Sequence, residues 1–125
     1  MSAKGSDLAR IQEIWDVGVQ TQNQIASLGF TRNRFLEPQS DVDDLIGEGI
    51  MNRVLRITEE AGRISEEVAK EYGFERQAAS GARNRLAHAY GEVDREIIWQ
   101  VLECDLPVLL KACQSYCDDQ GLDLS

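Results

Sequence analysis

The segment RNRLAHAY, residues 83–90, places several side chains with chemistry of their own close together. His88 is the only histidine of the chain, and an unperturbed imidazole titrates near neutrality, so it can act as base and then as acid. Arg83 stays charged and can hold a phosphate group with a forked pair of donors. Together they suit attack of an RNA 2′-hydroxyl on its own phosphorus: His88 takes the proton and Arg83 stabilises the charged phosphorane. This chemistry needs no metal, and DNA would be spared because it lacks the hydroxyl.

Helical geometry divides the segment into two lines. Successive helical residues advance by about 100°, so Arg83 and Tyr90 lie on nearly one line, while Asn84 and His88 face another way. The tips of Arg83 and His88 could converge only with help from the long stem of Arg83, or by facing a second copy of the helix. A two-fold dimer would bring two arginines and two histidines into one cleft. Spacing alone favours a simpler interpretation, in which His88 faces solvent at a helix end and Tyr90 packs at the edge of the core.

Composition favours an all-α protein. The 125 residues are expected to form a single domain, 1–125, with frayed ends at 1–5 and 119–125; strong helix formers dominate and only two prolines occur. The net charge of −9 argues against general coating of nucleic acid, yet residues 76–95 hold four arginines against two acidic residues. A small basic site around the histidine therefore remains possible.

The apolar spacing predicts an up-down bundle of four to five helices, with two long antiparallel helices and a kinked C-terminal helix. A first helix should be capped by Ser6 or Asp7 and stop at Gly29. A second should run from Asp41 to Tyr72 and end at Gly73. Its expected buried face comprises Val42, Leu45, Ile46, Ile50, Val54, Ile57, Ala61, Ile64 and Val68.

The remaining elements flank the histidine segment. A third helix should span residues 75–90, and Asp94 should cap a fourth that kinks or restarts at Pro107 and continues to about residue 118. Residues 30–40 are expected to form a loop. Its Arg32 and Arg34 could contact phosphate, although a solvated loop explains them more simply.

The three cysteines, at 104, 113 and 117, suggest reduced thiols in a cytoplasmic protein, since the N-terminal residues show no export signal. Cys113 and Cys117 are four apart on an expected helix and could seat a metal, but no other soft ligand is near in the sequence. We therefore expect no metal and no cofactor. No apolar run approaches transmembrane length, so no membrane contact is expected.

The stretch ARNRLAHAYGEVDREIIWQVLECDLPVLL, residues 82–110, resembles the signature region of the HEPN superfamily, specifically HepT-like toxins. The family pattern is Arg, four residues, His, one residue, Tyr; it falls on Arg83, His88 and Tyr90, with a polar residue, Asn84, after the arginine. Further matches are Asp94, Ile98, Trp99 and the DLP at 105–107, and upstream Glu60, Ala61, Arg63 and Ser65. The resemblance covers roughly residues 41–111. The turn YGEVD departs from the family's usual aromatic-glycine pair, which could alter the edge of the site.

The resemblance implies a homodimeric HEPN-like bundle that acts as a metal-independent endoribonuclease, the toxin of a type II/VII-like toxin–antitoxin pair. Arg83 and His88 would be catalytic and Asn84 supporting, with RNA as substrate and no specific DNA binding. The antitoxin would be a minimal nucleotidyltransferase that silences the toxin by transferring AMP to Tyr90. Two alternatives stay open: a non-catalytic helical module that is partner or substrate of such a nucleotidyltransferase, and a purely structural helical dimer.

Overall fold

A computed structural model describes residues 3–74 and 94–124, and within these ranges every regular element is helical, which confirms the all-α class. The expected helix over 75–90 lies outside the described residues. The elements are α1 (Ala3–Leu28), α2 (Arg32–Leu36), α3 (Asp41–Gly62), α4 (Glu66–Tyr72), α6 (Arg95–Gln100), a π-helical turn (Val101–Asp105) and α7 (Leu106–Asp119).

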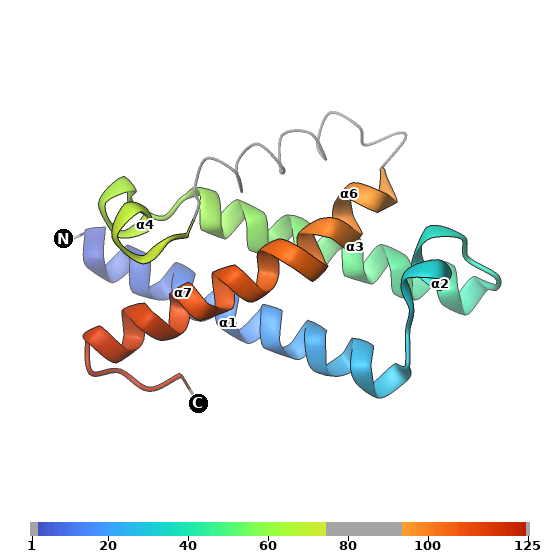
Figure 1. Cartoon of the computed structure of the whole chain (residues 1–125), viewed down its shortest axis with the longest axis horizontal. Helices are drawn as coiled ribbons and strands as arrows, with labels where there is room; N and C mark the ends of the chain where they lie inside the picture. Colours follow the sequence, from blue (N-terminus) through green and yellow to red (C-terminus); the bar gives the residue numbers. More distant parts are fainter. Residues whose placement is uncertain (1–2, 75–93, 125) are drawn as a thin grey trace.

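The long helices α1 and α3 run antiparallel, and α7 crosses them diagonally (Figure 1). Apolar side chains from all three meet in one buried cluster, which includes Ile11, Ile14, Ile50, Val54, Ile57, Leu106, Leu109 and Cys113. The expected pair of long antiparallel helices is therefore present, and it provides the platform on which α6 and α7 lie.

The start of α1 differs from the expectation. The helix begins at Ala3, so Ser6 and Asp7 lie inside it and the expected cap at these residues is wrong. Asp7 is instead buried, and its carboxylate accepts hydrogen bonds from the backbone N–H and the hydroxyl of Ser65. The expected stop is correct: Gly29 has φ +61°, a backbone conformation that glycine adopts without strain.

The expected second helix is two helices. The chain leaves α3 after Gly62, and Ser65 caps α4 by accepting a hydrogen bond from the Val68 N–H. Ser65 at this break also donates to the Asp7 carboxylate, so the start of α4 is held against α1. The predicted end at Gly73 is correct, with φ +78°. At the other end α3 begins at Asp41, as expected, and Ser40 caps it by accepting a hydrogen bond from the Asp43 N–H.

The predicted buried face of this helix is correct from Ile50 to Ile64, only partly correct at Val68, which is half-buried, and wrong at its beginning. Val42 and Leu45 are exposed to 60% and 73%, because the apolar stripe there faces away from the packed helices. Ile46 is half-buried at the edge of the α1–α3 contact. The first two turns of α3 thus carry apolar residues that the described part of the chain does not cover.

The expected loop at 30–40 contains a short helix. Thr31 caps α2 through its hydroxyl, and Phe30 and Phe35 at its two ends are buried. Both rings pack in the core and so hold the connection between α1 and α3 in place. The segment is therefore packed against the core, whereas its polar residues predicted a solvated loop.

The C-terminal helices follow the prediction closely. Asp94 caps α6 by accepting from the N–H groups of Glu96 and Ile97. The regular helix is interrupted by the π-helical turn and restarts at Leu106, with Pro107 in the first turn of α7, where a missing N–H is tolerated. Residues after α7, expected to fray, fold back instead: Leu122 N–H donates to the Cys117 carbonyl and Leu124 is buried.

No helix within residues 3–74 or 94–124 has both the length and the apolar character that a membrane span requires.

Candidate functional site

The four residues predicted to form the site, Arg83, Asn84, His88 and Tyr90, all lie within residues 75–93, outside the described part of the chain. The structure does describe the two points at which this segment joins the bundle. The first is Phe74, directly after α4, and the second is the start of α6. How firmly these points are held decides how well the fold can position a site between them.

The N-terminal anchor is Phe74, which is fully buried and whose N–H donates to the Ala69 carbonyl at 3.0 Å. The preceding turn is held by Tyr72, whose ring packs edge-on against Tyr116 at 5.2 Å. The Tyr72 hydroxyl donates to the Asp119 carboxylate at 2.9 Å. This hydrogen bond, together with desolvation, raises the pKa of Tyr72 to about 12, so the hydroxyl keeps its proton well into alkaline solution. The chain therefore leaves the bundle from a fixed point.

The C-terminal anchor is built around the guanidinium of Arg95. It donates to the Phe35 carbonyl at 2.6 Å and to the Asp44 carboxylate at 3.3 Å, and it lies over the Phe35 ring, 5.1 Å from its centre. Its side chain is only 18% exposed. Arg95 thereby joins the first residue of α6 to α2 and α3.

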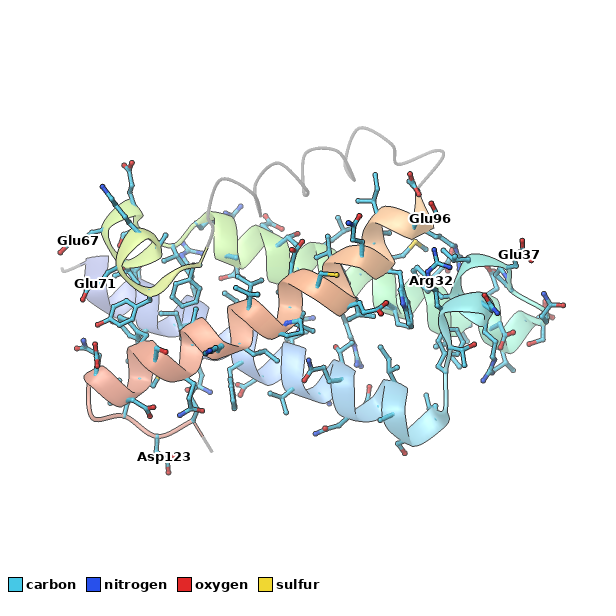
Figure 2. All side chains as sticks on the ribbon, viewed as in Figure 1. Arg32, Glu37, Glu67, Glu71, Glu96 and Asp123 are labelled. Carbon is cyan, nitrogen blue, oxygen red and sulfur yellow. The ribbon has the colours of Figure 1, made fainter. Side chains whose placement is uncertain are left out.

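Two further contacts complete this anchor. Trp99 of α6 packs on Phe35 with ring centres 5.3 Å apart. Arg32 of α2 donates to Glu96 of α6 at 3.1 Å, and Figure 2 shows the two labelled side chains together beside α2. The start of α6, five residues after Tyr90 in the sequence, is therefore held firmly against α2 and α3.

Sequence reasoning missed the Arg95 anchor, although a signal for it exists. Gly47 lies inside α3, where glycine is unfavourable by roughly 0.5–1 kcal/mol relative to alanine. A Cβ at Gly47 would lie 2.5 Å from Nη1 of Arg95, so the glycine makes room for the guanidinium. An isolated glycine in a helical pattern can indicate such a close approach.

The neighbouring Gly49 provides a matched control for this contact, because no described atom lies within 4 Å of a Cβ built there. We expect Gly49→Ala to raise the free energy of unfolding by about 0.5–1 kcal/mol through helix propensity. Gly47→Ala should instead lower it by about 1 kcal/mol, since the guanidinium of Arg95 has to move and its bond to the Phe35 carbonyl is weakened. Urea denaturation of both variants measures the difference; equal stabilisation by both would show that Arg95 yields freely.

The arginines expected to form a basic loop are paired with carboxylates. Arg34 donates to Asp43 through Nε and Nη2 at 2.9 and 2.7 Å, and its guanidinium lies over the Phe30 ring. Arg32 is paired with Glu96. The suggestion that this loop contacts phosphate therefore loses its support at Arg34, whose charge is neutralised within the fold.

Asp43 gives the anchor region a predictable response to acid. The Arg34 bond, followed by the Gln39 backbone N–H, holds the pKa of this carboxyl below its ordinary 3.8. A lowered folded-state pKa contributes stability that is complete above the unfolded value and is lost as pH falls through the folded value. We therefore expect wild type to be more stable than Asp43→Asn at neutral pH, with the gap closing below about pH 4. Denaturant midpoints across this range test it; a gap independent of pH would contradict the pairing.

The cysteines considered as metal ligands face the core. Cys113 is fully buried and its thiol donates to the Ile11 carbonyl at 3.6 Å. Burial raises the pKa of Cys113 to about 12 and also raises that of Cys117, so both thiols stay protonated. Protonated thiols are poor metal ligands. Cys113 lies in the contact between α7 and α1, where its thiol meets the Ile11 carbonyl, and Cys117 is buried as well. Within the described ranges no group of three or more potential ligands gathers.

Comparison with known proteins adds one finding. Residues 30–116, more than half of the chain, match the family model described as "Ribonuclease HepT-like". The match begins at α2 and ends within α7, so it contains both anchors and the whole segment between them. Neither a curated protein nor a solved structure matched the chain.

Proposed function

The chain belongs to the ribonuclease HepT-like family, and from this premise we propose that it is an endoribonuclease that uses Arg83 and His88 without a metal. The observation that carries the proposal is that the matched residues contain the whole Arg83, His88 and Tyr90 pattern, with Asn84 beside the arginine. The fold supports it, because Phe74 and Arg95 hold both ends of the segment in which these residues lie.

The proposed reaction is a transesterification within the RNA strand. His88 removes the proton from a 2′-hydroxyl, whose oxygen attacks the adjacent phosphorus. Arg83 stabilises the negative charge that gathers on the phosphorane oxygens, and Asn84 supports the arginine by a further polar contact. The bond from phosphorus to the 5′-oxygen then breaks, and that oxygen takes a proton from the imidazolium. The products are a 2′,3′-cyclic phosphate and a 5′-hydroxyl end.

We propose that the site forms between two copies of the chain. On a helix His88 would share a line with Asn84, four residues before it, and Arg83 with Tyr90, seven residues after it. Because these two lines differ, convergence of Arg83 and His88 within one copy is awkward. A two-fold axis passing near the segment brings the arginine of one copy toward the histidine of the other. Such a site is inactive in a monomer, so cleavage should rise with dimer concentration.

The deciding experiment is cleavage of single-stranded RNA by the purified chain in the presence of EDTA. The expected result is cutting that leaves cyclic phosphate ends, with the matching DNA untouched. A chain free of any modification that never cuts RNA would exclude the enzyme. It would leave the non-catalytic module that binds or is modified by a nucleotidyltransferase as the better interpretation.

Tyr90 is the proposed control point: a minimal nucleotidyltransferase antitoxin would transfer AMP from ATP to the Tyr90 hydroxyl, with release of pyrophosphate. Tyr90 and Arg83 share one helical line, so an attached AMP would bring its phosphate toward the arginine and block RNA. After co-expression with such an enzyme, we expect mass spectrometry to find the mass of AMP on the peptide that contains Tyr90. Tyr90→Phe should remain unmodified and active; a Tyr90→Phe chain that still gains the mass would show that another residue is the acceptor.

A further inference from the structure

The first two turns of α3 present an apolar surface that the described chain leaves uncovered. Val42 and Leu45 are exposed to 60% and 73%, and Leu28, at the end of α1, to 58%. Large aliphatic side chains gathered in this way are uncommon on a protein that binds nothing at that place. We call the surface formed by Asp41, Val42, Leu45, Glu48 and Gly49 the α3 face.

A groove of about 190 Å³ lies beside the α3 face, between α3 and α1. Figure 1 shows these two long helices running antiparallel. Aliphatic side chains from both helices line it: Ile25, Leu28, Ile46 and Ile50. Arg53 and Gln24 close it with a hydrogen bond to each other. The groove is therefore apolar and its walls are held together, which suits the insertion of an apolar anchor side chain.

Gly49 is also part of the groove lining, and the packing of the described chain does not explain it. Gly47 has to be small because of Arg95, whereas a Cβ at Gly49 would meet no described atom within 4 Å. A glycine at this point weakens α3 without serving an internal contact. Because Gly49 has no side chain, the backbone of a second molecule could come close to α3 at the groove.

The exposed charges of the α3 face are negative, and the one cation among the described residues that line the groove is Arg53, whose guanidinium donates to Gln24 and Thr21 at the groove wall. Asp41 and Glu48 are exposed on α3, and no hydrogen bond or ion pair joins their carboxylates to another described side chain. Asp44 adds a third carboxylate that is 61% exposed although it pairs with Arg95. An apolar surface with this rim repels nucleic acid and anionic lipid. A second copy is disfavoured as well, because it would bring the same carboxylates together in a chain of net charge −9.

We propose that the α3 face and its groove dock a basic amphipathic helix of a partner protein. Apolar side chains of that helix at i, i+3 or i+4 would enter the groove and cover Val42 and Leu45. Its lysine or arginine side chains would meet Asp41, Asp44 and Glu48 at the rim. The proposal does not depend on the ribonuclease chemistry, and it concerns a surface made entirely of described residues.

The test uses a fluorescent 18-residue helical peptide of lysine and leucine, with the leucines on one face, titrated with the full chain. We expect saturable binding that weakens in high salt, while a scrambled peptide and a glutamate–leucine peptide bind at least about tenfold more weakly. Leu45→Ser should weaken binding about tenfold by removing an apolar contact. Gly49→Leu should weaken it similarly by filling the groove, without removing any contact that the fold uses.

Val108→Ser is the matched control, since Val108 is 43% exposed on α7, away from the groove, and should leave binding unchanged. Circular dichroism and thermal melting of each variant separate lost binding from lost folding. Equal binding of the scrambled peptide, or binding unaffected by both groove substitutions, would overturn the proposal. So would sedimentation showing that wild type self-associates through this face and that Leu45→Ser abolishes the association, because the occupant would then be a second copy.

Discussion

Replacing His88 by alanine is expected to lower the rate of RNA cleavage by about 10²- to 10⁴-fold, the range that a positioned general acid–base group contributes. Arg83→Ala should cost about 10²- to 10³-fold, as loss of a donor to the transition state does. Both losses should appear in kcat more than in KM, because each group acts on charge or protons that move in the transition state. The measurement is steady-state cleavage of a defined single-stranded RNA in EDTA.

Arg85→Ala is the matched control for the arginine, because Arg85 lies two residues away in the sequence and on the expected helix would face the other side from Arg83. We expect it to change kcat by less than about threefold while weakening RNA binding at low salt. All three variants should keep the helical content and the melting temperature of wild type. Full activity in His88→Ala would remove the histidine from the mechanism, whatever the fate of Arg83→Ala.

Mixing the two inactive variants tests whether one site uses two chains. In a heterodimer of Arg83→Ala and His88→Ala, the intact arginine and the intact histidine belong to different copies. If the site is shared between copies, one of its two pairs is complete, and an equimolar mixture should regain up to about a quarter of wild-type activity. If each site lies within one copy, no complete pair exists and the mixture stays inactive.

The ends of several helices could be predicted because single residues decide them. Gly29 and Gly73 adopt the positive φ that terminates a helix, and Asp94 offers the short carboxylate that caps one. The break between α3 and α4 was missed because its cause is distant. Asp7 binds Ser65 from 58 residues away, and no local pattern reveals that partner.

Burial was harder to predict where a pattern extends past its contacts. Val42 and Leu45 continue the apolar spacing of α3, but α1 does not cover them. The apolar period of a helix predicts which side is apolar, but it does not show which element packs against that side. Likewise the residue types at 30–40 predicted a loop, whereas the rings of Phe30 and Phe35 are buried and make the segment part of the core. Both differences depend on tertiary packing.

The candidate site itself depends on sequence and family membership. Arg83 and His88 were chosen for their chemistry and their pattern, and they lie outside the described residues. What the structure adds is the support on either side, namely buried Phe74 and the Arg95 anchor. Neither could be chosen from spacing, because Arg95 was indistinguishable from the other arginines until its contacts with Phe35 and Gly47 were known.

Asp7→Ala is expected to be the most destabilising single change among the described polar residues, lowering the free energy of unfolding by about 2–4 kcal/mol. The carboxylate is 2% exposed and accepts from the Ser65 N–H at 2.9 Å and from the Ser65 hydroxyl at 2.6 Å. Removing it leaves two partly buried donors without their partner and frees the N-terminus of α4 from α1. The melting temperature should fall by about 10 °C in a chain of this size.

Asp16→Ala is the control on the same helix, since Asp16 is exposed and accepts only from Gln12; it should change stability by less than about 0.5 kcal/mol. Ser65→Ala completes a double-mutant cycle. Because Asp7 acts through Ser65, the double variant should lose clearly less than the sum of the single losses, with a coupling of at least about 1 kcal/mol. Additive losses would mean that Asp7 stabilises α1 by itself. In that case α4, and with it Phe74 at the entrance to the proposed site, would be held by apolar packing alone.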